Sequence, residues 1–219
     1  MAISNMTQAQ SIMKPGVCTS STRPASPYDG QVIYETDTDR AMVYNGTAWV
    51  VLSTGRANPV GLDLILIQTI GSAVSTVTVT SAFSALYDNY QIIVSGGVAS
   101  TDNAFNLTLG ATATGYYSSG FNQSMTASTI NATNTNNGTS FTSVAYGSTN
   151  ALSGEVFLDS PFASKRTMVK YHARGSSTTY FTNTQQGFLN DANSYTSFTL
   201  TTNTGTVTGG TVAVYGYAK

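Results

Sequence analysis

The sequence has few of the residues on which most enzyme chemistry depends. It contains one cysteine, Cys18, and one histidine, His172. A single cysteine excludes an internal disulfide framework and a zinc site built from cysteines. Any catalytic triad or histidine metal site would need His172, and the strand-like segment around it, M-V-K-Y-H-A-R, favours an ordinary strand position. The sequence therefore predicts no catalytic residue, no metal site, no cofactor and no enzyme.

Charge is also scarce. Asp, Glu, Lys and Arg make up 9% of the 219 residues, against about 25% in ordinary soluble domains, and residues 103–154 contain none of them. The 9 basic and 10 acidic residues give a net charge of -1, which leaves no basic surplus to neutralise phosphates. We therefore expect no nucleic-acid partner. A surface rich in Ser, Thr and Asn points instead to proteins displayed outside cells or on virus particles.

Long apolar runs are absent. The longest, residues 62–67, is interrupted by Asp63 and is far shorter than the roughly 20 residues that a membrane-spanning helix needs. The first residues lack the basic region and the apolar run of a secretory signal. We expect neither membrane insertion nor secretion by the ordinary route.

Helical periodicity of normal length is missing as well, whereas strand-like alternation recurs. The segment V-S-T-V-T-V-T, residues 74–80, alternates strictly and predicts a strand with one buried face. Turns rich in Gly, Asn and Ser separate further candidate strands. Such spacing favours an all-β fold, with an antiparallel β-sandwich of the jelly-roll kind over residues 62–219. The further candidates are residues 90–95, 104–109, 141–146, 154–158, 167–173, 179–184, 195–201 and 211–217.

The most patterned segment is R-P-A-S-P-Y-D-G-Q-V-I-Y-E-T-D-T-D-R-A-M-V-Y-N-G-T-A-W-V, which opens the region 23–54. Residues 31–35, 41–45 and 48–52 read as three short strands. The run T-D-T-D predicts the first turn, and Asn45-Gly46 predicts a type I′ hairpin turn. We expect a three-stranded β-meander, joined to the sandwich by a linker over residues 55–61.

Three strands this short cannot bury a core alone, because units below about 40 residues usually need a metal, a disulfide or oligomerisation. With the first two excluded, the meander should pack on copies of itself or on the sandwich. The aromatic residues predicted to supply this contact are Tyr34, Tyr44 and Trp49.

Residues 1–22 show no strand alternation. A flexible tail is the ordinary interpretation of such a terminus. The alternative that we favour is an arm held by a neighbouring subunit. Its predicted docking residues are Ile3, Met6, Ile12 and Met13.

Two further groups are candidates for binding. Residues 111–140 read as an elaborate loop pair with short strands, in which aromatic and amide side chains suit sugar recognition or chain-to-chain packing: Tyr116, Tyr117, Phe121 and Asn122. Four basic residues lie within ten positions, and on one strand Lys170, His172 and Arg174 would share a face. This basic stripe favours a solvated strand face or a contact between subunits, with an anionic glycan as the alternative; its basic members are Lys165, Arg166, Lys170 and Arg174.

The segment from Arg23 to Val50 resembles a short module of tail-fibre, neck-fibre and other minor structural proteins of tailed bacteriophages, of the form R-P-x-x-P-x-x-G-x-x-I-Y-x-T-D-T followed by V-Y-x-G-x-x-W. The ending T-V-A-V-Y-G-Y-A-K also resembles the closing strand of such proteins. The resemblance implies a homotrimeric virion component that assembles in the host cytoplasm, with an arm of residues 1–22 that docks onto other virion proteins of the capsid, neck or tail. It further implies a meander around the threefold axis and an outward β-sandwich.

The resulting hypothesis is a short fibre or spike that contacts the host surface through its sandwich, with a host cell-surface glycan as a candidate ligand. One alternative is a capsid-decoration protein that stabilises the head. Another is a polysaccharide depolymerase of the tailspike type, which the scarcity of acids and the absence of long parallel-β repeats disfavour.

Overall fold

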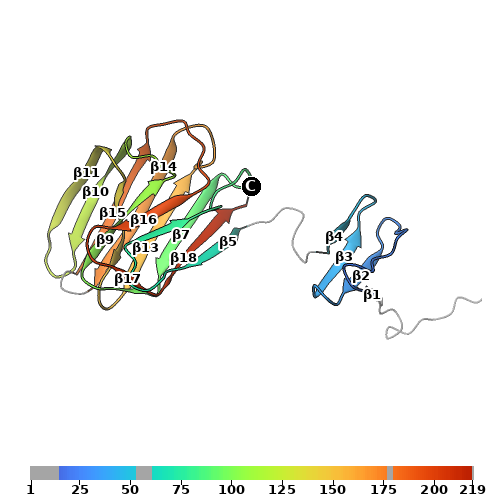
Figure 1. The fold of residues 1–219 in the computed structure, drawn as a ribbon. Coiled ribbons are helices and arrows are strands. Elements are labelled where there is room, and N and C mark those ends of the chain that lie inside the picture. The colour runs from blue at the N-terminus through green and yellow to red at the C-terminus, as the bar shows by residue number, and fades with distance from the viewer. Residues whose placement is uncertain (1–14, 53–60, 177–179, 219) are drawn as a thin grey trace, which may run out of the picture. The chain divides into compact units, whose positions relative to one another are not determined.

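The computed structural model describes residues 15–52, 61–176 and 180–218. The chain divides into two compact units, Met1–Ala57 and Asn58–Lys219, and each is described by itself. All regular elements of the described residues are strands (Figure 1). These residues contain no helix with the length and apolarity that a membrane crossing needs.

The first unit contains one sheet, here named the N-terminal sheet, in the order β1-β2-β3-β4. Its strands are β1 (Gly16–Cys18), β2 (Val32–Glu35), β3 (Arg40–Tyr44) and β4 (Trp49–Val51). The three predicted strands are confirmed as β2, β3 and β4, which pair antiparallel. The fourth strand, β1, pairs parallel with β2 and falls inside the predicted arm, so that prediction is wrong for its three residues. A strand this short has too few alternations to be recognised in a sequence.

Two turns connect the antiparallel strands of this sheet, and the predicted type is wrong for the second. The T-D-T-D turn joins β2 to β3 as expected. In the second, the amide of Asn45 donates to the carbonyl of Ala48 at 3.1 Å, so the central residues are Gly46 and Thr47. Only Gly46 has a positive φ, of 87°, as in a type II′ turn, whereas type I′ needs positive φ at both central residues. The type I′ prediction is therefore wrong: the Asn45 side chain accepts from the amides of Thr47 and Ala48 and begins the turn.

The second unit contains a jelly roll of eight strands, which confirms the predicted fold. The strands pair in nested order, first with last: β5 with β18, β6 with β16, β7 with β13 and β9 with β12. Pairing of β7 with β18 and of β9 with β16 assembles them into two sheets, β5-β18-β7-β13 and β6-β16-β9-β12. The strands are β5 (Leu62–Thr69), β6 (Thr76–Val79), β7 (Asn89–Ser95), β9 (Asn103–Leu109), β12 (Phe141–Gly147), β13 (Leu152–Asp159), β16 (Phe198–Thr202) and β18 (Thr211–Tyr217).

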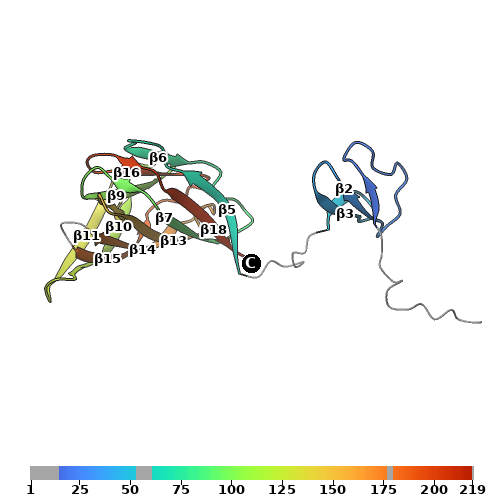
Figure 2. The same ribbon diagram turned by 90° about the horizontal axis from the view of Figure 1, so that it is seen from below.

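Four added strands widen only the first of these sheets. Beyond β13 it continues in the order β14-β15-β10-β11. We name the result the large sheet and the opposing β6-β16-β9-β12 the cover sheet; Figure 2 shows the two layers, with β6, β16 and β9 above β14, β13 and β7. The added strands are β10 (Tyr116–Ser124), β11 (Ile130–Gly138), β14 (Thr167–Ser176) and β15 (Tyr180–Leu189), and a small separate pair joins β8 (Val98–Ala99) to β17 (Val207–Thr208).

The prediction of a loop pair with short strands over residues 111–140 is wrong in the length of the strands, because most of the segment forms the hairpin of β10 and β11, with nine residues in each strand. Its strands carry Ser, Asn and Thr on both faces, so no apolar alternation marks them. The predicted linker lies, except for Gly61, outside the described residues, as do the predicted docking residues Ile3, Met6, Ile12 and Met13.

The sandwich core lies between the large sheet and the cover sheet. Alternate residues of β7, β13 and β18 point inward, while the residues between them point to solvent. Aromatic rings close the core, with Phe141 packed edge-on against Tyr116 at 4.8 Å between ring centroids. The other face of the large sheet, here the outer face, is covered by no element of the cover sheet and is available for contacts.

Candidate functional site

The N-terminal sheet buries one face only. Ile33 and Met42 are 1% and 5% exposed and lie opposite each other in the register. Glu35, on the same face and 1% exposed, forms an ion pair with Arg23 and accepts from the Thr38 hydroxyl at 2.8 Å. The hydrogen bonds from Arg23 and Thr38 lower the pKa of the Glu35 carboxyl. This face thus holds a small core around one charged pair and is open at β4, where Val51 is 45% exposed.

The opposite face of the same sheet is apolar and open. Val17 is 70% and Val50 is 38% exposed. The strand register aligns its side chains in two cross-strand rows, with Val17 and Val50 at the outer strands and half-buried members between them. We name it the valine face; its members are Val17, Val32, Tyr34, Ala41, Val43 and Val50.

The structure does not bring the three predicted oligomerisation residues together. Tyr34 lies in the valine face, where its hydroxyl bonds the Asp39 carboxylate. Tyr44 and Trp49 lie opposite each other on the other face, with ring centroids 5.5 Å apart. The prediction of contact residues from the sequence did not include the valines of this face, because valine is common in any strand. The sequence does contain a signal for this face, because alternate positions of two successive strands are all apolar or aromatic: Val32, Tyr34, Ala41 and Val43.

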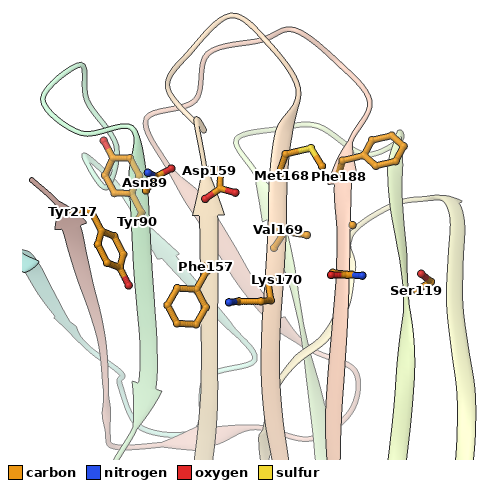
Figure 3. Close-up of a pocket in the computed structure, with 12 residues that line it drawn as sticks. Asn89, Tyr90, Ser119, Phe157, Asp159, Met168, Val169, Lys170, Phe188 and Tyr217 are labelled. Carbon is orange, nitrogen blue, oxygen red and sulfur yellow. The ribbon is translucent and has the colours of Figure 1, made fainter. Parts of the chain in front are cut away.

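A groove of about 770 Å³ lies on the outer face of the large sheet. Its polar and apolar side chains come from six strands (Figure 3). Cross-strand pairing places Phe157 beside Lys170 and Lys170 beside Gln186 in one row. The next row holds Asn89, Asp159, Met168 and Phe188. Ser119 of β10 and Tyr217 of β18 complete the outward-facing side chains of the groove.

Cations in and beside this groove contact rings. The Lys170 ammonium lies 4.6 Å from the centroid of the Phe157 ring, and in Figure 3 it points at that ring. The Arg166 guanidinium lies 5.4 Å from the centroid of Phe188, whose other neighbour is the stacked ring of Tyr117 at 5.2 Å. Neither Lys170 nor Arg166 has an ion-pair partner among the residues that the structure describes.

Apolar side chains are also exposed where the outer face ends at β5. Leu64 is 53%, Ile67 56% and Tyr217 37% exposed, and Leu64 pairs with Tyr215 of β18. The outer face therefore changes from apolar at β5, through rings and charges over β13 and β14, to hydroxyl and amide groups over β15, β10 and β11.

The four predicted ligand-contact residues are split between the two faces of β10. Tyr117 and Phe121 point to the outer face, and Phe121 is 40% exposed. Tyr116 is 0% exposed, and its hydroxyl bonds backbone groups of Leu109 and Thr112. Burial raises the pKa of Tyr116 to about 12. The prediction is wrong for Tyr116, because a core residue cannot touch a ligand; Asn122 also lies on the inward side of the strand.

The basic stripe has the geometry that the period-two rule predicted. Lys170, His172 and Arg174 alternate with buried Tyr171 and Ala173 along β14, so they share the outer face. The Nδ1 of His172 lies 3.1 Å from the hydroxyl of Thr184 on the neighbouring strand. His172 is thus a strand residue with a cross-strand hydrogen bond.

No group of three or more His, Cys, Asp or Glu side chains that could hold a metal occurs among the residues that the structure describes. The arrangement offers two surfaces for binding, the valine face and the groove. Comparison with protein-family models, with curated proteins and with solved structures found no match to this chain.

Proposed function

We propose that this chain is a structural protein of a bacteriophage virion, a short homotrimeric appendage of the fibre or spike type. Its N-terminal segment docks onto other virion proteins, the N-terminal sheet brings three copies together, and the sandwich contacts the host surface. Its role is structural and adhesive rather than enzymatic.

The observation that carries this proposal is the valine face. The R-P-x-x-P module that resembles phage appendage proteins builds the sheet that bears it. A sheet of four short strands with one apolar face left open is incomplete as an independent unit. Copies of the same chain supply matching apolar surface, because association into a closed symmetric oligomer buries the same patch on every copy.

The groove supports an adhesive role for the sandwich. Its volume of about 770 Å³ lies within the range of roughly 300–1,000 Å³ that ligand sites occupy. A decoration protein that only stabilises the head uses the valine face and a docking segment but has no need for a groove lined by rings, amides and charge. Host contact is therefore favoured over head decoration.

The test is to locate the protein on intact particles with a labelled antibody raised against the full chain. Label at a tail or neck appendage is the expected result. Label spread over the head surface would favour the decoration role instead, and purified particles that carry no label would overturn the proposal.

A further inference from the structure

The groove on the outer face has a rigid frame. Its side chains stand on β7, β10, β13, β14, β15 and β18, all within one hydrogen-bonded sheet. Side chains on adjacent strands keep fixed spacings, so the positions of the groove's polar groups are set by the register rather than by a loop. Such a surface is preorganised for a ligand several residues long.

The lining suits sugar rings. Phe157, Met168 and Tyr217 supply apolar surface for the C–H faces of a pyranose. The amides of Asn89 and Gln186 lie in the same groove, and an amide both donates to and accepts from hydroxyl groups. Asn89 and Gln186 are exposed, so their hydrogen-bonding groups are accessible.

The groove also holds a cation without an acidic partner. Lys170 is exposed in the middle of the lining, with Phe157 and Gln186 as its cross-strand neighbours. Among the residues that the structure describes, no carboxylate lies within ion-pair distance of Lys170. The contact with the Phe157 ring orients the ammonium over the groove without neutralising it.

Acidic and basic groups both lie around Lys170: Asp88 precedes the lining residue Asn89, and its carbonyl accepts from the amide of Ser160 beside Asp159. Asp159 is the acidic residue of the lining. Glu155, one row further along β13, accepts a hydrogen bond from Gln91 at 2.5 Å. Against these stand Lys170 in the groove and Arg166 at its edge, over Phe188, with Arg174 further along the outer face. Lys170 lies on the ring side of the groove, so an anionic group placed at its ammonium would gain a charge-assisted hydrogen bond.

From this geometry we propose that the groove binds an acidic saccharide, one whose sugar rings carry carboxylate groups. The rings pack on Phe157 and Tyr217, hydroxyl groups bond Asn89, Gln186 and Asp159, and a carboxylate bonds the Lys170 ammonium. The inference rests on the adhesive role proposed above and names the ligand class and site for that role.

The test uses the full-length chain on an array of bacterial capsular and lipopolysaccharide glycans with acidic and neutral members. We expect binding to be confined to carboxylate-bearing glycans and to weaken as salt is raised. The matched ligand is the same glycan with its carboxylates reduced to alcohols, which should bind at least tenfold more weakly.

Two variants locate the site. Lys170→Met keeps most of the apolar length of the side chain and should weaken binding at least tenfold. Lys165→Met removes the same charge from an exposed residue outside the groove lining and should bind as the wild type does. Equal thermal unfolding midpoints of the two variants check that both fold.

Three results would overturn the inference. The wild type could retain no acidic glycan, it could bind neutral glycans as tightly as acidic ones, or the Lys170→Met variant could bind acidic glycans as tightly as the Lys165→Met variant does. Each leaves the particle-labelling test of the proposed function unaffected, since a virion appendage without this ligand would still label the particle.

Discussion

At the scale of single residues, Glu35 makes the stability of the N-terminal sheet depend on pH. Its pKa is lowered by the bonds from Arg23 and Thr38, and that of Asp37 by the side chain and amide of Ser20. Both groups have a lower pKa folded than unfolded, so the unfolded chain binds protons more readily as the pH falls. Their contribution to stability is present above the ordinary carboxyl pKa of about 4 and is lost as the pH falls through the folded values.

We therefore expect denaturant unfolding of the N-terminal sheet, followed by the fluorescence of Trp49, to have a lower midpoint at pH 3 than at pH 7. Trp49 is the only tryptophan of the chain, so this signal reports on this sheet. Glu35→Gln should lower the midpoint at pH 7 and make it less sensitive to pH. Equal midpoints of the wild type at both pH values would contradict the stabilising role given to the Glu35 and Asp37 carboxylates.

A second residue-scale prediction concerns Tyr171, which is 0% exposed. Its hydroxyl donates to Gln185 Oε1 at 3.0 Å and lies 3.2 Å from the hydroxyl of Ser118, which also donates to Gln185 Oε1. Gln185 in turn donates to Asn183, which donates to the Ser143 carbonyl at 2.8 Å. Burial raises the pKa of Tyr171 to about 12, so the phenol stays a neutral donor at any ordinary pH.

Tyr171→Phe removes the buried hydrogen bond to Gln185 and should cost about 1–2 kcal/mol of sandwich stability, which lowers the midpoint of thermal unfolding by about 2–8 °C in a domain of this size. The matched change is Tyr117→Phe, at a half-buried outer-face residue whose ring contacts Phe188. That variant should stay within about 0.5 kcal/mol of the wild type. Equal midpoints of thermal unfolding for the two variants would show that the hydrogen bonds of Tyr171 do not stabilise the sandwich.

At the scale of elements, the turn between β3 and β4 depends on Gly46. Its φ of 87° is a left-handed conformation that costs an L-residue roughly 1–2 kcal/mol. Gly46→Ala should lower the unfolding free energy of the N-terminal sheet by about that amount, measured in urea by Trp49 fluorescence. Thr47→Ala, one position on and without a positive φ, should cause a clearly smaller loss, and a larger loss there would rule out the turn geometry as the cause.

The elements also show where sequence patterns suffice. The strands β7, β9 and β18 were predicted nearly to their ends, because each carries apolar residues at alternate positions that face the core. The strand β5 was missed because a register shift opposite Val214 and Tyr215 places Ile65 and Leu66 in succession against the core. The length of the strands β10 and β11 was missed because hydroxyl and amide residues lie on both of their faces.

The candidate surfaces were harder to predict than the fold. The shared face of Lys170 and Arg174 follows from the sequence alone, since it needs only the alternation of one strand. The groove does not, because Phe157, Lys170 and Gln186 become neighbours only through the pairing of three strands. Tyr116 and Tyr117 are adjacent in sequence but lie on opposite faces, so the composition of a segment cannot tell a core ring from an accessible one.

At the scale of the whole molecule, the valine face predicts the oligomeric state. We expect the full chain to be a trimer by size-exclusion chromatography with light scattering, since three copies can bury this face around a common axis. Val50→Glu places a carboxylate within the apolar contact and should shift the mass toward that of a monomer of 22.9 kDa, because an unpaired charge is costly to bury.

The matched control is Val51→Glu, which makes the same change one position further along β4. The Val51 side chain is 45% exposed and points to the opposite face of β4, so this variant should leave the trimer intact. Trp49 fluorescence should show both variants folded. A wild-type chain that is monomeric at micromolar concentration, or two variants that dissociate equally, would exclude the valine face as the contact between copies.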